Sequence, residues 1–251
     1  MGKFIFSLLI LIPLMISGKE TIKVTRERKN SPYREVFHVL KSDTSVRQGT
    51  YKLAVGRNVL EKGYYKMGLK DSIWLQYSLK GKKRSKGMYE NGRRSGTWEF
   101  FDYFGKLEQK VDFSKNQVLY YPTEMGNQIF RITSATDTIM MLLDQPPLYV
   151  GGMSRFSDCV LKELNVNPLH KAGENVSGLV YVTITIDSLG KTSHHRILKG
   201  IGKSCNAEAL RVIKAIPDEW LPGMLNGKRV AVEYVVPFQF NLNKNQTKQK
   251  P

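Results

Sequence analysis

Apolar residues occupy every second position in residues 178–187, where Val180, Val182, Ile184 and Ile186 alternate with other side chains. Because successive side chains of a strand point to opposite faces of a sheet, this pattern predicts a strand with one buried face. Residues 188–190, Ser-Leu-Gly, form a short loop with the glycine that three-residue hairpin turns favour. We therefore expect residues 191–198 to return as the partner strand.

Helical spacing of apolar residues is found on both sides of this hairpin, at Phe156, Val160, Leu161 and Leu164 and again at Leu210, Ile213 and Ile216. Pro217 cannot continue the second helix, and Pro222 with Gly223 turns the chain after Trp220. Asn226-Gly227 is a tight-turn dipeptide, and an apolar, β-branched strand is expected over residues 229–240. The order helix, strand, strand, helix, strand predicts an α+β domain, an antiparallel sheet with two helices on one face.

The residues EALRVIKAIPDEWLPG and NGKRVAVEYVVPFQF make this C-terminal part resemble a known family. Residues 146–242 resemble the C-terminal domain of TonB, the periplasmic energy transducer, in its Bacteroidetes-type variant. The resemblance implies a domain that binds the short TonB box of outer-membrane TonB-dependent transporters by β-augmentation, in which an extended peptide adds a strand to a sheet edge.

The edge implied by the resemblance is the last strand, and its backbone would supply the hydrogen bonds. The expected peptide-binding residues are Arg229, Val230, Ala231, Val232, Glu233, Tyr234, Val235 and Val236. Pro237 supports this choice, because proline in a sheet is confined to edges, strand starts and bulges.

An internal repeat precedes this domain. Residues Gly63, Tyr65, Gly68, Trp74 and Gly81 recur 24 positions later as Gly87, Tyr89, Gly92, Trp98 and Gly105. A fixed period of this length indicates one supersecondary unit stacked on copies of itself. The pattern resembles MORN-type repeats in the YwqK-like variant and predicts a stack of β-hairpins over residues 30–120. Trp74 and Trp98 are expected in the core on one face, with Tyr77 and Phe101 on the other. Residues 33–40 and 120–133 are expected to cover the two ends.

The remaining segments complete the expected organisation. A charged Lys3, an apolar stretch over residues 4–17 and the small residues Ser17 and Gly18 are typical of a secretory signal peptide, predicted over residues 1–18. An uncleaved inner-membrane anchor is the alternative. Residues 121–145 are expected to be a linker and residues 243–251 a disordered tail. These features predict a protein of the periplasm or cell envelope.

The net charge of +17 is concentrated in the repeat, chiefly over residues 52–94. Export argues against a nucleic-acid partner. The alternatives are an anionic envelope polymer or lipid head groups bound by the basic repeat, or a solvated face that gives solubility.

No catalytic motif and no metal-ligand spacing is found, so we expect a protein that is not an enzyme and needs no cofactor or metal. The histidines are His38, His170, His194 and His195, and the adjacent pair should point to opposite faces of its strand. Cys159 and Cys205 form either a disulfide, which an oxidising compartment permits, or two separate buried thiols.

Two functional hypotheses follow. The first is a TonB-related transport component that engages transporter peptides. The second is an exported scaffold whose hairpins and C-terminal domain hold envelope material. Energy transduction also needs a membrane-spanning helix and a long proline-rich spacer, and neither is expected here. The sequence leaves the oligomeric state open.

Overall fold

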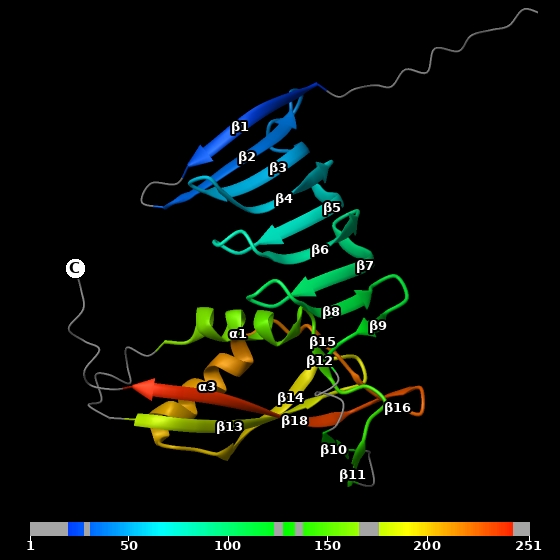
Figure 1. The fold of residues 1–251 in the computed structure, drawn as a ribbon, viewed down its shortest axis with the longest axis vertical. Helices are drawn as coiled ribbons and strands as arrows, with labels where there is room; N and C mark the ends of the chain where they lie inside the picture. The colour runs from blue at the N-terminus through cyan, green and yellow to red at the C-terminus, as the bar shows by residue number, and fades with distance from the viewer. Residues whose placement is uncertain (1–19, 28–30, 123–127, 134–137, 166–175, 243–251) are drawn as a thin grey trace, which may run out of the picture.

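Two antiparallel sheets make up most of the molecule (Figure 1). The computed structural model describes residues 20–27, 31–122, 128–133, 138–165 and 176–242. A nine-stranded sheet forms the N-terminal part. The C-terminal part holds a five-stranded sheet and the helices α1 (Gly152–Glu163) and α3 (Lys203–Ala215). The predicted α+β class is therefore confirmed.

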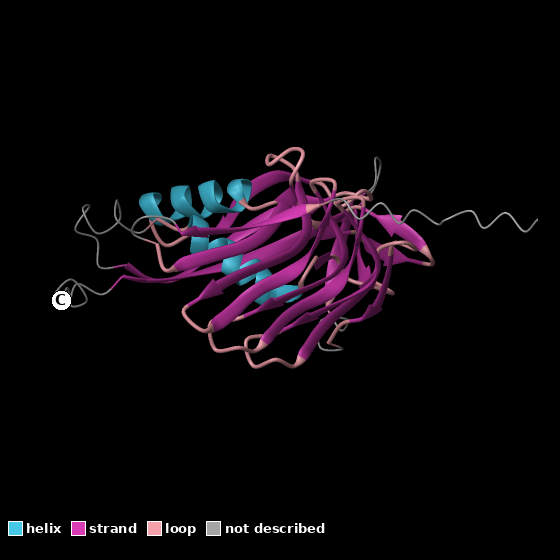
Figure 2. Ribbon diagram, turned by 90° about the horizontal axis from the view of Figure 1, so that it is seen from above, coloured by secondary structure: helices cyan, strands magenta, loops and turns pink. Residues whose placement is uncertain are grey.

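The nine-stranded sheet is a simple meander in which each strand pairs with the next one along the chain. Its strands are β1 (Thr21–Glu27), β2 (Tyr33–Leu40), β3 (Arg47–Val55), β4 (Asn58–Lys66), β5 (Leu69–Tyr77), β6 (Lys83–Glu90), β7 (Arg93–Phe101), β8 (Leu107–Asp112) and β9 (Gln117–Tyr120). Viewed from above, the strands twist progressively across the sheet (Figure 2), as sterics of L-residues require.

The five-stranded sheet has the order β11-β10-β18-β13-β14. Its strands are β10 (Ile129–Thr133), β11 (Thr138–Leu142), β13 (Val176–Ile186), β14 (Thr192–Lys199) and β18 (Val232–Leu242). Two short pairs complete the domain: β12 (Leu148–Tyr149) with β15 (Trp220–Leu221), and β16 (Gly223–Leu225) with β17 (Lys228–Val230). Asn226 and Gly227 both have positive φ in the tight turn between β16 and β17, as this dipeptide predicts.

A glycine–tryptophan contact explains the repeat of the nine-stranded sheet. Trp74 and Trp98 are only 1% and 3% exposed. A Cβ on Gly63 would lie 2.2 Å from the Trp74 ring, and one on Gly87 would lie 2.0 Å from the Trp98 ring. Glycine is thus the residue that lets each ring lie flat on the neighbouring strand. Both indole N–H groups donate to backbone carbonyls, Trp74 to Tyr64 at 3.1 Å and Trp98 to Met88 at 3.0 Å.

The core of the C-terminal domain lies between its sheet and the two helices. Val180, Val182, Ile184 and Ile186 are all completely buried, so the predicted alternation is confirmed. They pack with α3 residues, among them Cys205, Ala209 and Val212. Trp220, 6% exposed, packs into the same core, as expected for the corner after α3.

Three expectations differ from the structure. The predicted linker, residues 121–145, contains β10 and β11, which extend the C-terminal sheet because Phe130 and Ile132 are buried beside Val232. Residues 120–133 therefore do not cover the repeat sheet, which ends at β9. At the other end residues 33–40 form β2 as expected, but β1 lies outside it and was not predicted.

Both predicted terminal segments, the signal peptide over residues 1–18 and the tail over residues 243–251, lie outside the described residues. Within the described part of the chain, none of the helices has the length and apolar character needed to cross a membrane.

Candidate functional site

The strand β18 has two unequal sides. On one side it pairs with β13 along its full length, from Val232 opposite Ile186 to Leu242 opposite Val176. On the other side it pairs with β10 only at Val232 and Glu233. From Tyr234 onward, β18 has a strand neighbour among the described residues only on the β13 side. We call this the open side of β18, where the backbone beyond Glu233 has no strand partner among the described residues.

Pro237 indicates which backbone groups face the open side. It lies opposite Tyr181 in a register that runs without a bulge from Val232 to Leu242. Proline has no N–H, so it would interrupt the ladder if its backbone faced β13. In antiparallel sheets the N–H and C=O of successive residues point alternately to the two sides. Val235, Gln239 and Asn241 therefore share the outward orientation of Pro237.

The closed end of this edge is fixed by a charge contact across three strands. Glu233 of β18 accepts a 2.6 Å hydrogen bond from Arg196 of β14 and lies 3.7 Å from the Arg131 guanidinium of β10. The side chains of Arg131 and Arg196 remain half exposed, so each pair contributes little by itself. Arg131 joins β10 to the start of β18, and Arg196 joins β14 to the same carboxylate.

Tyr234 connects this edge to the domain core. Its ring lies 5.3 Å from that of Trp220 and stacks at 6.2 Å on that of Phe130. Burial raises the pKa of the Tyr234 hydroxyl. Tyr234 is therefore a packing residue, and the candidate site depends on backbone groups of β18 rather than on this side chain.

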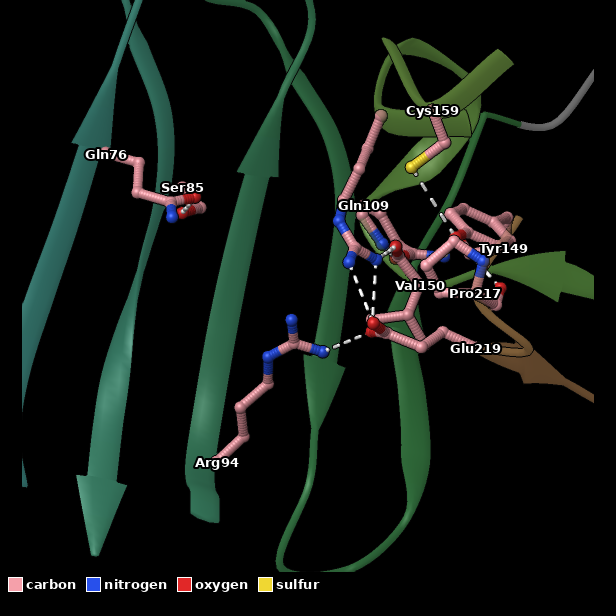
Figure 3. A network of polar contacts seen from close by, with 11 residues as sticks. Gln76, Ser85, Arg94, Gln109, Tyr149, Val150, Cys159, Pro217 and Glu219 are labelled. Atoms are coloured by element: carbon pink, nitrogen blue, oxygen red, sulfur yellow. Dashed lines mark hydrogen bonds and ion pairs between the residues drawn. The ribbon is translucent and has the colours of Figure 1, made fainter. Parts of the chain in front are cut away.

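A second polar arrangement joins the two sheets (Figure 3). Glu219, just before β15, accepts hydrogen bonds from Arg155 of α1 at 2.8 Å and from Arg94 of β7 at 2.9 Å. Burial alone would raise the pKa of the Glu219 carboxyl, but the hydrogen bond and charge of Arg155, together with Arg94, hold that pKa below its ordinary value. Glu219 is thus ionised at neutral pH and joins β7 of the repeat sheet to α1 of the C-terminal domain.

The position of Arg94 in the repeat explains why its side chain contacts the C-terminal domain. In the preceding units, Arg47 lies 3.7 Å from Glu35 and Lys70 lies 2.8 Å from Glu61. Glu35 and Glu61 lie in a row of equivalent positions across the sheet. The next position of this row, 24 residues after Glu61, is Ser85, which carries no charge. Arg94 consequently has its carboxylate partner in the C-terminal domain.

Gln109 of β8 completes the junction. It is 1% exposed and continues the row of Glu61 and Ser85 by another 24 positions. Its amide donates to the Tyr149 carbonyl at 3.1 Å and accepts from the Gly151 N–H at 2.7 Å. A buried amide satisfied on both sides fixes the loop before α1 against the repeat sheet. The sequence analysis missed this role of Gln109, and its position 24 residues after Ser85 is the signal that could have found it.

The eight residues expected to bind peptide do not lie in one strand. Arg229 and Val230 belong to β17, which pairs with β16, and Ala231 separates β17 from β18. Val232, Glu233, Tyr234, Val235 and Val236 lie in β18. The expected single strand over residues 229–240 is therefore two strands, and its first part is closed by β16 and β10.

The cysteines and histidines of the described residues lie at separate places in the fold. Cys159 and Cys205 pack against the same core, and the Cys159 sulfur lies 3.7 Å from the Tyr149 hydroxyl. His194 has positive φ and is exposed, whereas His195 is partly buried and has a lowered pKa, mainly because of burial. Within the described residues, no three His, Cys, Asp or Glu side chains are arranged to hold a metal ion.

One comparison with known proteins bears on this domain. Residues 168–242 match the family model of the Gram-negative bacterial TonB protein C-terminal. The matched range includes β13, β14, α3 and β18, and so contains the open edge. It associates the C-terminal part of the chain with TonB and thereby with the cell envelope. The repeat sheet, β10 and β11 lie outside the TonB match. No curated protein and no solved structure matches the chain.

Proposed function

We propose that this chain is a non-enzymatic, TonB-like envelope protein that binds an extended segment of an outer-membrane transporter along the open side of β18. The observation that carries the proposal is the one-sided pairing of β18, whose described partner beyond Glu233 is β13 alone. A peptide strand added there would pair with the outward backbone groups of Val235, Gln239 and Asn241. The TonB match at residues 168–242 supports the same edge.

Binding through the backbone predicts which substitutions matter. Val235→Pro deletes an outward N–H that no described strand uses, so the protein should fold and peptide binding should be lost. Val235→Ala is the matched control, because it removes the side chain and keeps the N–H. Proline at Val232 or Tyr234 is unsuitable, because those N–H groups face β13 and their loss would damage the fold.

The test is a titration of a TonB-box peptide against residues 19–251, followed by backbone amide shifts. We expect saturable shifts along residues 234–241, close to wild-type affinity for Val235→Ala and no binding for Val235→Pro. Unmoved amides at saturating peptide, or an equal affinity for folded Val235→Pro, would contradict the proposal and favour an exported envelope scaffold.

Contact of the basic repeat with an anionic envelope polymer or lipid head groups stays a separate prediction. On the face of the repeat sheet that carries Trp74 and Trp98, three cations are already paired: Arg47 with Glu35, Lys70 with Glu61 and Arg94 with Glu219. Exposed lysines such as Lys52, Lys66 and Lys86 would have to make such a contact.

A further inference from the structure

The face of the repeat sheet that points away from the two repeat tryptophans carries a row of charged cross-strand neighbours. Strand pairing places six residues side by side from β3 to β8, in the order Lys52, Lys62, Leu75, Lys86, Glu99 and Lys110. Each of them is the chain neighbour of a residue in the row that contains Trp74 and Trp98. Because successive side chains of a strand point to opposite faces, the six side chains share the other face. We call these six residues the lysine row.

The 24-residue repeat makes the lysine row basic. Lys62, Lys86 and Lys110 occupy equivalent positions of successive units. Lys110 has a carboxylate partner in the row, because Glu99 lies 3.5 Å from its ammonium group. The position equivalent to Glu99 in the preceding unit is Leu75, which is uncharged. Lys62 and Lys86, which lie on either side of Leu75, therefore have no carboxylate between them.

Three lysines of the row, Lys52, Lys62 and Lys86, are exposed and have no ion-pair partner among the described residues. Lys52 lies directly opposite Lys62 on the neighbouring strand. Like charges directly opposite each other destabilise an antiparallel sheet. By contrast, cations on the tryptophan face are paired with carboxylates. A bound anion would relieve the repulsion between Lys52 and Lys62.

The C-terminal domain leaves the lysine row uncovered. Leu148, Val150 and Leu221 of that domain pack in the same apolar cluster as Trp98 and Val111. The domain therefore covers part of the tryptophan face, and the lysine row lies on the opposite face of the sheet. A ligand can reach the row without displacing any part of the described fold.

The spacing and direction of the lysines decide what kind of anion fits. Adjacent strands are about 4.8 Å apart, so the backbones of Lys62 and Lys86, two strands apart, are separated by about 9.6 Å. The twist of the sheet (Figure 2) turns the side-chain direction by about 20–25° per strand, or about 60–75° over the three steps from Lys52 to Lys86. A flat lipid bilayer cannot face all three lysines at once, whereas a flexible linear chain can follow the row.

We infer that the lysine row binds a linear acidic polysaccharide that crosses strands β3 to β6. A chain with one carboxylate in each disaccharide unit matches the row, with one carboxylate between Lys52 and Lys62 and the next at Lys86. The groups that meet are exposed charges, so binding weakens as salt is added. The lysine row is apart from the open side of β18, and the two sites are independent.

Hyaluronan octasaccharide, a linear chain with one carboxylate per disaccharide, is the probe. It is titrated at low ionic strength against ¹⁵N-labelled residues 19–251. We expect saturable shifts of the backbone amides of Lys52, Lys62, Leu75 and Lys86, and their loss at high salt. N-acetylchitotetraose, a neutral linear saccharide, should leave these amides unmoved.

Lys62→Gln should weaken octasaccharide binding about threefold, the effect of losing one exposed ion pair. The same substitution should not lower the unfolding midpoint of the free protein, because it removes the like charge opposite Lys52. Lys106→Gln is the matched control: it makes the same change in net charge at an exposed lysine just before β8, outside the row. It should leave the affinity for the octasaccharide unchanged.

Three results would overturn the inference: unmoved row amides at the highest octasaccharide concentration, equal affinities of Lys62→Gln and Lys106→Gln, or equal binding of the neutral saccharide. Vesicles of phosphatidylglycerol are the competing probe. Displacement of the octasaccharide by vesicles at equal concentration of negative charge would make a lipid head group the better ligand and would also contradict the assignment.

Discussion

Arg94 of β7 donates a 2.9 Å hydrogen bond to Glu219, which lies 125 positions further along the chain. Glu219 also accepts from Arg155 of α1, so one carboxylate is shared by the repeat sheet, the first helix and the C-terminal domain. The contact joins the repeat sheet to the C-terminal domain, and its strength depends on the ionisation of Glu219.

Acid should weaken this junction. The pKa of Glu219 in the folded protein is below its ordinary value of 4.5, so its contribution to stability is complete above about pH 4.5 and is lost as the pH falls through the folded pKa. Glu219→Gln cannot titrate and is the control. The difference in thermal unfolding between wild type and Glu219→Gln should therefore shrink on acidification. A difference that stays constant with pH would show that the charge of Glu219 does not hold the junction.

Gly87→Ala should destabilise the repeat sheet by about 1–3 kcal/mol, the usual cost of overpacking. The added Cβ would lie 2.0 Å from the Trp98 ring. Denaturant unfolding of Gly87→Ala, of Trp98→Leu and of the double variant gives a double-mutant cycle. The glycine substitution should cost much less in the Trp98→Leu protein, where the ring is absent. Equal costs in both proteins would mean that the close packing is not the reason for glycine at this position.

Trp220→Ala should be among the most damaging changes in the C-terminal domain, at about 3–5 kcal/mol. The ring is buried against Tyr149, Phe156 and Tyr234. Leu189→Ala is the control, since Leu189 is 74% exposed and should change stability by no more than about 0.5 kcal/mol. Similar unfolding midpoints for the two variants would refute the assignment of Trp220 to the core.

The hairpin of β10 and β11 should contribute to the stability of the C-terminal domain. Residues 128–242 should unfold cooperatively and at a higher temperature than residues 146–242, because the shorter fragment exposes Val232 and leaves the Tyr234 ring without Phe130. Circular dichroism of both fragments measures this difference. Identical melting curves would indicate that the hairpin adds nothing to the fold.

The parts of the fold that follow local rules could be predicted from the sequence. Alternation identified the buried face of β13, helical spacing identified α1 and α3, and Asn226-Gly227 identified the turn before β17. Trp74 and Trp98 were identified as core positions by their equivalent places in the repeat. Each of these features depends on neighbours within one strand, helix or turn, which the sequence displays directly.

The sequence could not predict which part of β18 has no strand partner, because this depends on which distant segments pair with β18. Residues 129–142 show little periodicity, and they join the sheet through Phe130 and Ile132. The ion pairs of Glu219 with Arg94 and Arg155 were also missed, since they join residues that are distant in the sequence. Both features arise from tertiary contacts.

The row of Glu35, Glu61, Ser85 and Gln109 also limits how a sheet of this kind can change in length. Additional 24-residue units placed before β2 would leave Arg94, Gln109 and Glu219 at their present separation. A unit inserted between β7 and β8 would move Arg94 away from the C-terminal domain by two strands. Growth by duplication is therefore compatible with the junction only on the N-terminal side of β7.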